Sequence, residues 1–183
     1  MSLRYAILGL LSFEPMSGYT LKTRYFDGSV AYFWPADQAQ IYRTLQALQA
    51  DGLVESETVT GETRPDSRVY RMTDAGLAGL RDWLGEGRPI VTHKDAFLVQ
   101  LYFARLLTPA QLMRVLRVRR SEHQALQRHL DQVQIPPGQT PDMRRQVRFG
   151  ALVLDYGRRR ERMMLDWLDA TIEAVSEWPE DPG

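Results

Sequence analysis

The segment 60–67 is polar and rich in turn-forming residues. A strand-like run lies on each side of it, and a helical pattern lies beyond each run. The first helical pattern covers 37–51 and stops at Gly52. The runs 53–59 and 68–72 are typical of antiparallel strands joined by a hairpin tip. Thr73 then opens another helix. This order predicts the second half of a winged helix-turn-helix, a module whose usual role is to bind duplex DNA.

The helix expected over 37–51 carries the clearest local signals. Asp37 stands three residues before Gln40, which is the spacing of a capping box that satisfies two free amides at the helix start. The apolar residues on its inner side are Ile41, Leu45 and Leu48. The outer face and its flank carry Gln38, Ala39, Tyr42, Arg43 and Gln46. Such a face suits the major groove, where glutamine and arginine read base edges.

Two further helices are expected before this one. Apolar residues at helical spacing predict the first over 3–12, and Ser17 caps a second that fades near Gly28. The pair Phe33 and Trp34 follows. Both rings are expected to fill the gap between helices rather than contact a ligand, because their exposure would be costly.

The second half of the chain is expected to be helical. A segment rich in glycine and proline ends the fourth helix, so we expect a DNA-binding domain over 1–88 and a helical domain over 89–178. Capped starts at Thr108 and Thr140 predict two long helices. The Pro/Gly break between them predicts an antiparallel hairpin. The tail over 179–183 is expected to be disordered.

The last long helix is apolar over more of its circumference than one hairpin can cover. A second copy of the chain is therefore expected to bury the excess. The residues assigned to this contact are Phe149, Leu152, Val153, Tyr156, Met163, Met164 and Trp167. The expected fold is mainly α: a winged helix-turn-helix of three helices and a two-stranded wing, followed by a long-helix dimerisation hairpin.

Composition excludes several classes of function. The chain has no cysteine, which rules out disulfides and thiolate metal sites and fits a reducing compartment. No apolar run approaches the roughly 20 residues that span a bilayer, and the first residues lack a secretory pattern. We therefore expect a cytoplasmic protein with no membrane partner. His123 and His129 are six residues apart, which is not a usual metal-binding spacing, and no enzyme motif is present. No catalytic residue, metal or cofactor is expected.

Charge is unusual for a DNA-binding domain. Residues 1–88 hold 9 Lys and Arg against 11 Asp and Glu, a net charge of −2. Phosphate neutralisation normally supplies much of the affinity for DNA. The favourable charge would therefore have to be local, on side chains such as Lys22, Arg43, Arg64 and Arg68.

Several short motifs follow one another over residues 1–85. They are Ser17-Gly18-Tyr19, Tyr32-Phe33-Trp34, Ile41-Tyr42-Arg43, Gly52-Leu53-Val54, and Arg68-Val69-Tyr70 with Thr73 and Gly76. In this combination the chain resembles the PadR family of bacterial transcriptional regulators. It most resembles the branch with a long C-terminal helical region, typified by AphA.

The resemblance implies a dimer clasped by its C-terminal helices, with two winged domains on a palindromic operator. It also implies that such proteins are often repressors, some of them released by a small aromatic effector. The family's DNA-facing positions correspond here to Tyr19, Lys22, Gln38, Ala39, Tyr42, Arg43, Gln46, Arg64, Arg68 and Tyr70. Tyr19 and Tyr70 are expected to be core rings first and phosphate contacts second. The wing departs from the family's basic tip, because Glu62 and Asp66 lie beside its arginines.

Two functions follow from these observations. The leading hypothesis is a dimeric, sequence-specific regulator, a repressor that binds double-stranded DNA through the helix at 37–51 and the wing at 53–72. The alternative is a dimeric winged-helix module that binds protein without specific DNA binding, which the charge balance favours. Salt dependence separates them, because binding to DNA weakens steeply as salt rises. A sensor whose DNA affinity is tuned by a small molecule is compatible with the first.

Overall fold

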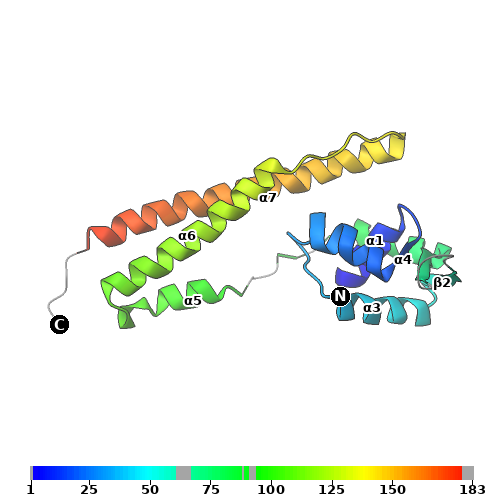
Figure 1. The fold of residues 1–183 in the computed structure, drawn as a ribbon, viewed down its shortest axis with the longest axis horizontal. Coiled ribbons are helices and arrows are strands. Elements are labelled where there is room, and N and C mark those ends of the chain that lie inside the picture. Colours follow the sequence, from blue (N-terminus) through cyan, green and yellow to red (C-terminus); the bar gives the residue numbers. More distant parts are fainter. Residues whose placement is uncertain (1, 61–66, 88, 91–93, 179–183) are drawn as a thin grey trace. The chain divides into compact units, whose positions relative to one another are not determined.

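A computed structural model describes residues 2–60, 67–87, 89–90 and 94–178 (Figure 1). The chain divides into two compact units, Met1–Val91 and Thr92–Gly183. The tail over 179–183 and the tip of the wing, which includes Arg64, lie outside the described residues.

The N-terminal unit contains the helices that the sequence predicts. They are α1 (Ser2–Leu11), α2 (Gly18–Thr20) continued by η1 (Leu21–Ser29), α3 (Gln38–Ala50) and α4 (Asp74–Gly85). The Ser17 hydroxyl accepts a hydrogen bond from the Thr20 amide at 3.0 Å and so caps α2. Asp37 and Gln40 form the predicted capping box at the start of α3. The backbone leaves helical geometry at Gly28, where the sequence pattern fades.

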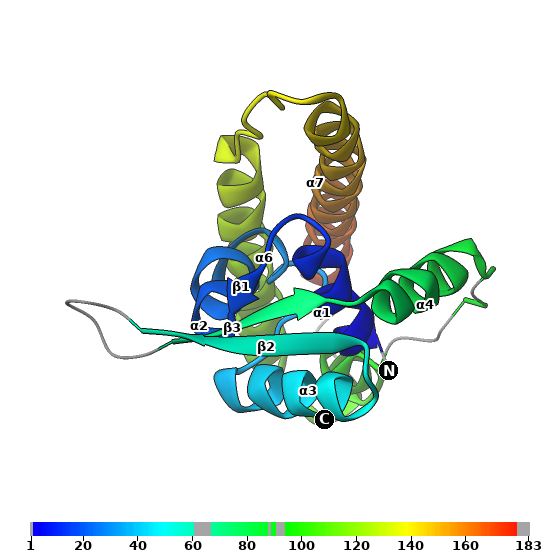
Figure 2. The ribbon, with the colours of Figure 1, turned by 90° about the vertical axis from the view of Figure 1, so that its right-hand side faces the viewer.

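Three strands form an antiparallel sheet in the order β1-β3-β2 (Figure 2). They are β1 (Met16–Ser17), β2 (Val54–Val59) and β3 (Ser67–Met72). The strands β2 and β3 form the wing. The prediction of two strands therefore missed β1, because a two-residue strand is too short to show an alternating pattern.

The core of the N-terminal unit lies where α1, η1, α3 and the sheet meet. Its most deeply buried side chains are Ile7, Leu8, Leu21, Ile41, Leu45, Leu48 and Tyr70. The expectation that Phe33 and Trp34 fill this core is wrong, because they are 54% and 37% exposed. Phe26, Val30 and Ala36 contribute to the core from the neighbouring positions instead.

The C-terminal unit is a helical hairpin with a short helical segment before it (Figure 1). Its elements are α5 (Ala96–Tyr102), η2 (Ala104–Leu106), α6 (Pro109–Gln132) and α7 (Pro141–Ser176). A capping box between Thr108 and Gln111 starts α6, and Thr140 caps α7. In the described residues no helix combines the length and the apolar character needed to cross a bilayer.

Polar contacts tie α6 to α7. The guanidinium of Arg158 donates to the Leu130 carbonyl at 2.9 and 3.1 Å, at the C-terminal end of α6. The Arg120 guanidinium forms an ion pair with Asp169, and this hydrogen bond lowers the pKa of the Asp169 carboxyl. Glu161 is fully buried and accepts from His123 and from Arg160.

Candidate nucleic-acid interface

The outer face of α3 is open to solvent. Ile41, Leu45 and Leu48 point into the core, as the helical wheel predicts. The side chains on the opposite face are all exposed, namely Gln38, Ala39, Arg43 and Gln46. The helix therefore presents two amides, a cation and one small residue along one solvent-facing side, which is the chemistry of a major-groove reader.

The cation on the outer face of α3 is Arg43. Its Nε lies 3.4 Å from the Ala39 carbonyl oxygen, and no acidic side chain of the described residues forms an ion pair with it. Arg4 pairs with Asp51 at 2.9 Å, and Arg24 and Arg71 also face acidic partners. An arginine that has no acidic partner can bind a ligand at a lower cost than one held in an ion pair.

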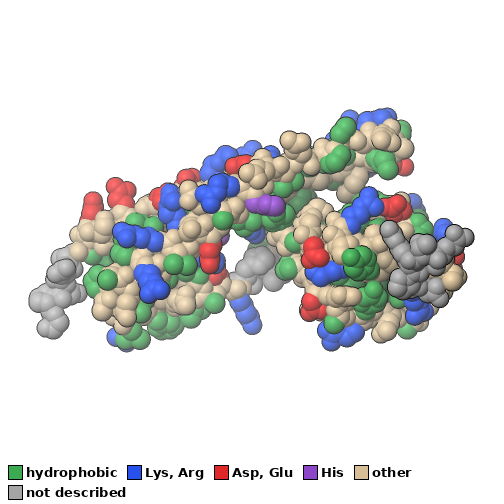
Figure 3. Space-filling view, in the orientation of Figure 1, with side chains coloured by type: hydrophobic (Ala, Val, Ile, Leu, Met, Phe, Trp, Pro, Cys, Tyr) green, Lys and Arg blue, Asp and Glu red, His purple; other side chains and the backbone are tan. Residues whose placement is uncertain are grey.

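The charges of the remaining surface are mixed. On the face shown in Figure 3, basic and acidic side chains of the described residues are interspersed over the N-terminal unit. This agrees with the net charge of −2 counted over residues 1–88. Attraction of phosphate would therefore depend on particular side chains and not on a broad basic field.

The start of α2 lies close to α3. A Cβ on Gly18 would stand 2.7 Å from a ring atom of Tyr42, so the absence of a side chain there lets the Tyr42 ring pack against the α2 backbone. The half-buried ring agrees with the flank position that the sequence predicts. Tyr19 is 65% exposed, so the expectation of a core ring is wrong at this position. Lys22 is half-buried and forms an ion pair with Asp27 on the same helix.

The wing residues differ from the sequence-based assignment. Tyr70 is only 2% exposed and belongs to the core, so its side chain offers no free surface to a phosphate. The Arg68 guanidinium donates to Ser56 Oγ at 2.8 Å and to Gln49 Oε1 at 2.9 Å. Gln49 and Ser56 were not among the predicted site residues, because a polar residue on a helix flank or a strand gives no signal of its tertiary partner.

The apolar stripe of α7 is largely exposed. Phe149, Leu152, Val153, Tyr156 and Met163 lie open in the single chain, whereas Met164 is half-buried. Trp167 makes an edge-to-face contact with Phe97 of α5 at a centroid distance of 6.2 Å. A hollow beside this stripe is lined by Pro141, Arg144, Arg145, Arg148, Phe149 and Leu152. Apart from Trp167 and Met164, the named residues of the stripe therefore form an apolar surface that the described part of the chain leaves exposed.

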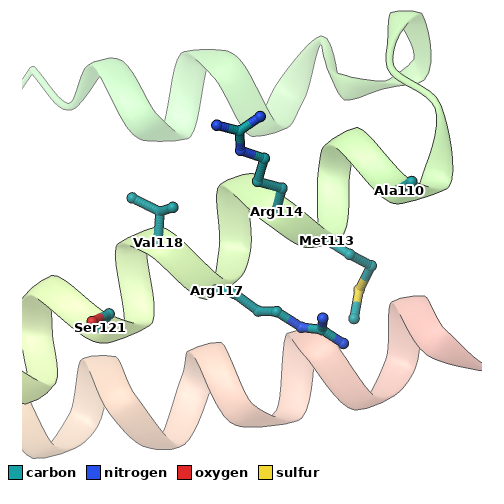
Figure 4. A pocket seen from close by; sticks show the side chains of 6 residues that line it. All are labelled: Ala110, Met113, Arg114, Arg117, Val118 and Ser121. Atoms are coloured by element: carbon teal, nitrogen blue, oxygen red, sulfur yellow. The ribbon is translucent and has the colours of Figure 1, made fainter.

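A second hollow, of about 430 Å³, lies along α6 (Figure 4). Ala110, Met113, Arg114, Arg117, Val118 and Ser121 line it, all from one helix. Their spacing of three and four residues marks one side of that helix, so the hollow is a surface depression and not an enclosed chamber. Across the described part of the chain no three metal-binding side chains cluster together.

Both units match known protein families. Residues 7–82 match the transcriptional regulator PadR-like family, and residues 93–176 match the family described as virulence activator alpha C-term. The negative transcriptional regulator PadR of Bacillus subtilis (strain 168) is 31% identical over 177 residues, which cover 94% of this chain and 97% of that protein. The chain belongs to the PadR-like family of transcriptional regulators. Members of the PadR-like family are regulators and not enzymes, so this chain is a non-enzymatic protein.

Solved structures of the PadR-like family agree with this fold. The crystal structure of Bacillus subtilis PadR in complex with operator DNA has a TM-score of 0.81 at 30% identity, covering 96% of this chain and 99% of that one. The same protein in complex with p-coumaric acid has a TM-score of 0.77 at 30% identity, covering 97% and 100%. The Vibrio cholerae virulence activator AphA has a TM-score of 0.74 at 25% identity, covering 95% and 98%. The expected AphA-like C-terminal region is thereby confirmed.

Proposed function

We propose that this protein is a dimeric regulator that binds a palindromic operator in double-stranded DNA and acts as a repressor in the cytoplasm. The observation that carries the proposal is the open outer face of α3, with an arginine that no described acid pairs. The complex of Bacillus subtilis PadR with operator DNA supports it. That relative's name as a negative regulator supports repression.

The elements have different roles in this proposal. Arg43, Gln46 and Gln38 reach base edges in the major groove. Tyr19 and Lys22 contact phosphates near the start of the second helix. Tyr42 contributes its hydroxyl from the flank of α3. Ala39 lets the backbone of α3 approach the duplex.

The dimer is formed by the apolar stripe of α7. Two-fold symmetry would place two recognition helices on successive faces of the duplex, with half-sites about 34 Å apart or somewhat more. A palindromic operator is the expected partner of such a dimer, because the symmetry of the protein is mirrored in the DNA.

Arg43→Ala tests the assignment of the recognition face. We expect it to cost on the order of 1–3 kcal/mol in operator affinity, because a bidentate contact to guanine would be lost. The operator is first selected from a genomic DNA pool with the purified protein, and affinity is then measured by fluorescence anisotropy. Arg81→Ala is the matched control, since Arg81 is an exposed cation of the same unit on α4. Equal affinities for Arg43→Ala and Arg81→Ala would remove Arg43 from the interface.

The competing function is a winged-helix module that binds protein, which the net charge of −2 over residues 1–88 favours. The same titration separates the two functions when it is repeated at several salt concentrations. Operator binding should weaken by orders of magnitude between about 50 and 200 mM salt if several phosphates are contacted. Binding that is absent, or that does not depend on salt, would favour the protein-binding module.

We also propose a small aromatic effector, supported by the complex of Bacillus subtilis PadR with p-coumaric acid. A ligand that binds the folded protein raises its thermal stability by mass action. We therefore expect p-coumaric acid or a related phenolic acid to raise the melting temperature and to weaken operator binding. Benzoic acid, which lacks the phenol and the propenoate, is the control. Unchanged melting temperature with a series of aromatic acids would contradict the effector proposal.

A further inference from the structure

The inner face of the wing carries an arginine. Side chains alternate along a strand, so Arg68 lies on the same side of β3 as Tyr70, which is buried. The register pairs Ser56 with Tyr70 and Thr58 with Arg68. Arg68 and Ser56 are therefore diagonal neighbours on the inner face. The Arg68 guanidinium also lies 5.6 Å from the centroid of the Tyr70 ring.

Three polar side chains close a hydrogen-bonded triangle on this face. Arg68 Nε donates to Ser56 Oγ at 2.8 Å, and Arg68 Nη2 donates to Gln49 Oε1 at 2.9 Å. The Ser56 hydroxyl donates to the same Gln49 oxygen at 3.3 Å. The triangle joins α3, β2 and β3, so it connects the recognition helix to both strands of the wing.

The geometry of the triangle suits an arginine. Ser56 accepts one hydrogen bond and donates another, and the Gln49 oxygen accepts two, which matches its two lone pairs. A guanidinium presents its Nε and Nη2 donors from two nitrogen atoms in one rigid plane, which suits these two acceptors, whereas the donors of a lysine all lie on one nitrogen atom. Although Arg68 is exposed, its guanidinium is held by two side chains of its own unit, so it fits a bridge between elements better than a mobile phosphate ligand.

We propose that Arg68 is a positioning residue, which fixes the wing against the end of α3 and so sets the frame in which α3 reads the operator. This inference rests on the proposed function and replaces the phosphate contact expected of Arg68 from the sequence. Gln49 is its partner in that role. Loss of either side chain should therefore weaken operator binding even though neither side chain contacts the DNA.

The test compares an operator duplex with an unrelated duplex of equal length. Arg68→Ala, Arg68→Lys and Gln49→Ala should each lower operator affinity about tenfold, within the range of coupling found inside one hydrogen-bond network. Affinity for the unrelated duplex should not change, because that affinity depends on phosphate contacts. The double variant Arg68→Ala with Gln49→Ala should bind the operator no more weakly than either single variant.

Arg71→Ala is the matched control. Arg71 lies on β3 like Arg68, but on the outer face of the strand, which it shares with Val69. Its exposed side chain lies opposite Glu55. Its loss removes the same charge without touching the triangle, so the ratio of operator to unrelated affinity should stay at the value of the unaltered protein. Thermal unfolding of every variant establishes that the N-terminal unit is folded in the assay.

Two results would overturn the inference. In the first, Arg68→Ala weakens both duplexes equally, Arg68→Lys restores binding and Gln49→Ala has no effect, as for a phosphate ligand. In the second, the losses in Arg68→Ala and Gln49→Ala add in the double variant. An unaltered protein that binds neither duplex would instead contradict the proposed function itself, so the two failures are distinguishable.

Discussion

Gly76 occupies a position in α4 where any side chain would collide with the backbone. A Cβ there would stand 2.1 Å from the Leu53 carbonyl oxygen and 2.9 Å from Met72 Cγ. The close approach arises because Thr73 caps α4 and also donates its hydroxyl to the Gly52 carbonyl at 2.8 Å. This contact holds the first turn of α4 against the chain that links α3 to the wing.

Gly76→Ala should therefore destabilise the N-terminal unit by about 3 kcal/mol, because the helix must move away from the linker. Gly79→Ala is a strict comparison in the same helix, since a Cβ at Gly79 meets nothing within 4 Å. That substitution should stabilise by up to about 1 kcal/mol through helix propensity. Urea unfolding followed by circular dichroism measures both. Similar midpoints for the two variants would show that the contact at Leu53 is relieved without cost.

Among the elements, the hairpin of α6 and α7 contains a carboxyl side chain that water does not reach. Glu161 is fully buried and accepts from His123 Nδ1 at 2.5 Å and from Arg160 at 2.8 and 3.0 Å. Removal of Glu161 would leave the largely buried His123 ring without this acceptor, which is more costly than loss of the contact alone, whereas the more exposed Arg160 can turn to water.

Glu161→Ala should lower the free energy of unfolding of the hairpin by about 3 kcal/mol, on these grounds. Glu161→Gln keeps the shape and an acceptor oxygen, so its loss should be smaller. Glu173→Ala removes an exposed carboxylate of the same helix and should stay within about 0.5 kcal/mol of the unaltered protein. The comparison is made by urea unfolding at a fixed protein concentration. Equal stability of Glu161→Ala and Glu173→Ala would show that the buried network is dispensable.

The elements with strong local signals could be predicted from the sequence. The capping boxes at Asp37 and Thr108 act between neighbours in the chain, so the starts of α3 and α6 were predicted correctly. The strand β1 could not be predicted, because its two residues are a strand only through their pairing with β3. The triangle of Arg68, Gln49 and Ser56 was missed for the same reason. Its members are 7 to 19 residues apart and meet only in the folded unit.

Burial by tertiary contacts also explains the errors in the predicted site. From the sequence, Tyr19 and Tyr70 receive the same prediction, because each has an apolar ring and a polar hydroxyl. In the structure Tyr19 is exposed near the start of α2, whereas Tyr70 lies on the middle strand β3 and packs in the core cluster. The position of a strand in its sheet is not a local property, so no periodicity could have separated the two.

At the scale of the whole molecule, the exposed apolar stripe on α7 predicts a contact between two copies of the chain. Leu152 and Tyr156 are one helical turn apart and each is 66% exposed. Burial of such side chains contributes about 1.5–3 kcal/mol each, and a carboxylate in their place would have to be desolvated at the contact. The double variant Leu152→Glu with Tyr156→Glu should therefore have the mass of one chain in light scattering, whereas the unaltered protein should have the mass of two.

Ala151→Glu provides the control for that experiment. Ala151 is exposed, precedes Leu152 directly, and lies about 100° away from it around the helix, on the side opposite to Val153. The same acidic residue there should leave the dimer intact. Because a dimer binds two half-sites together and a monomer only one, the monomeric variant should also lose most of its operator affinity. A double variant that remains dimeric would place the contact elsewhere on the chain, and full operator affinity in a monomer would contradict the palindromic operator.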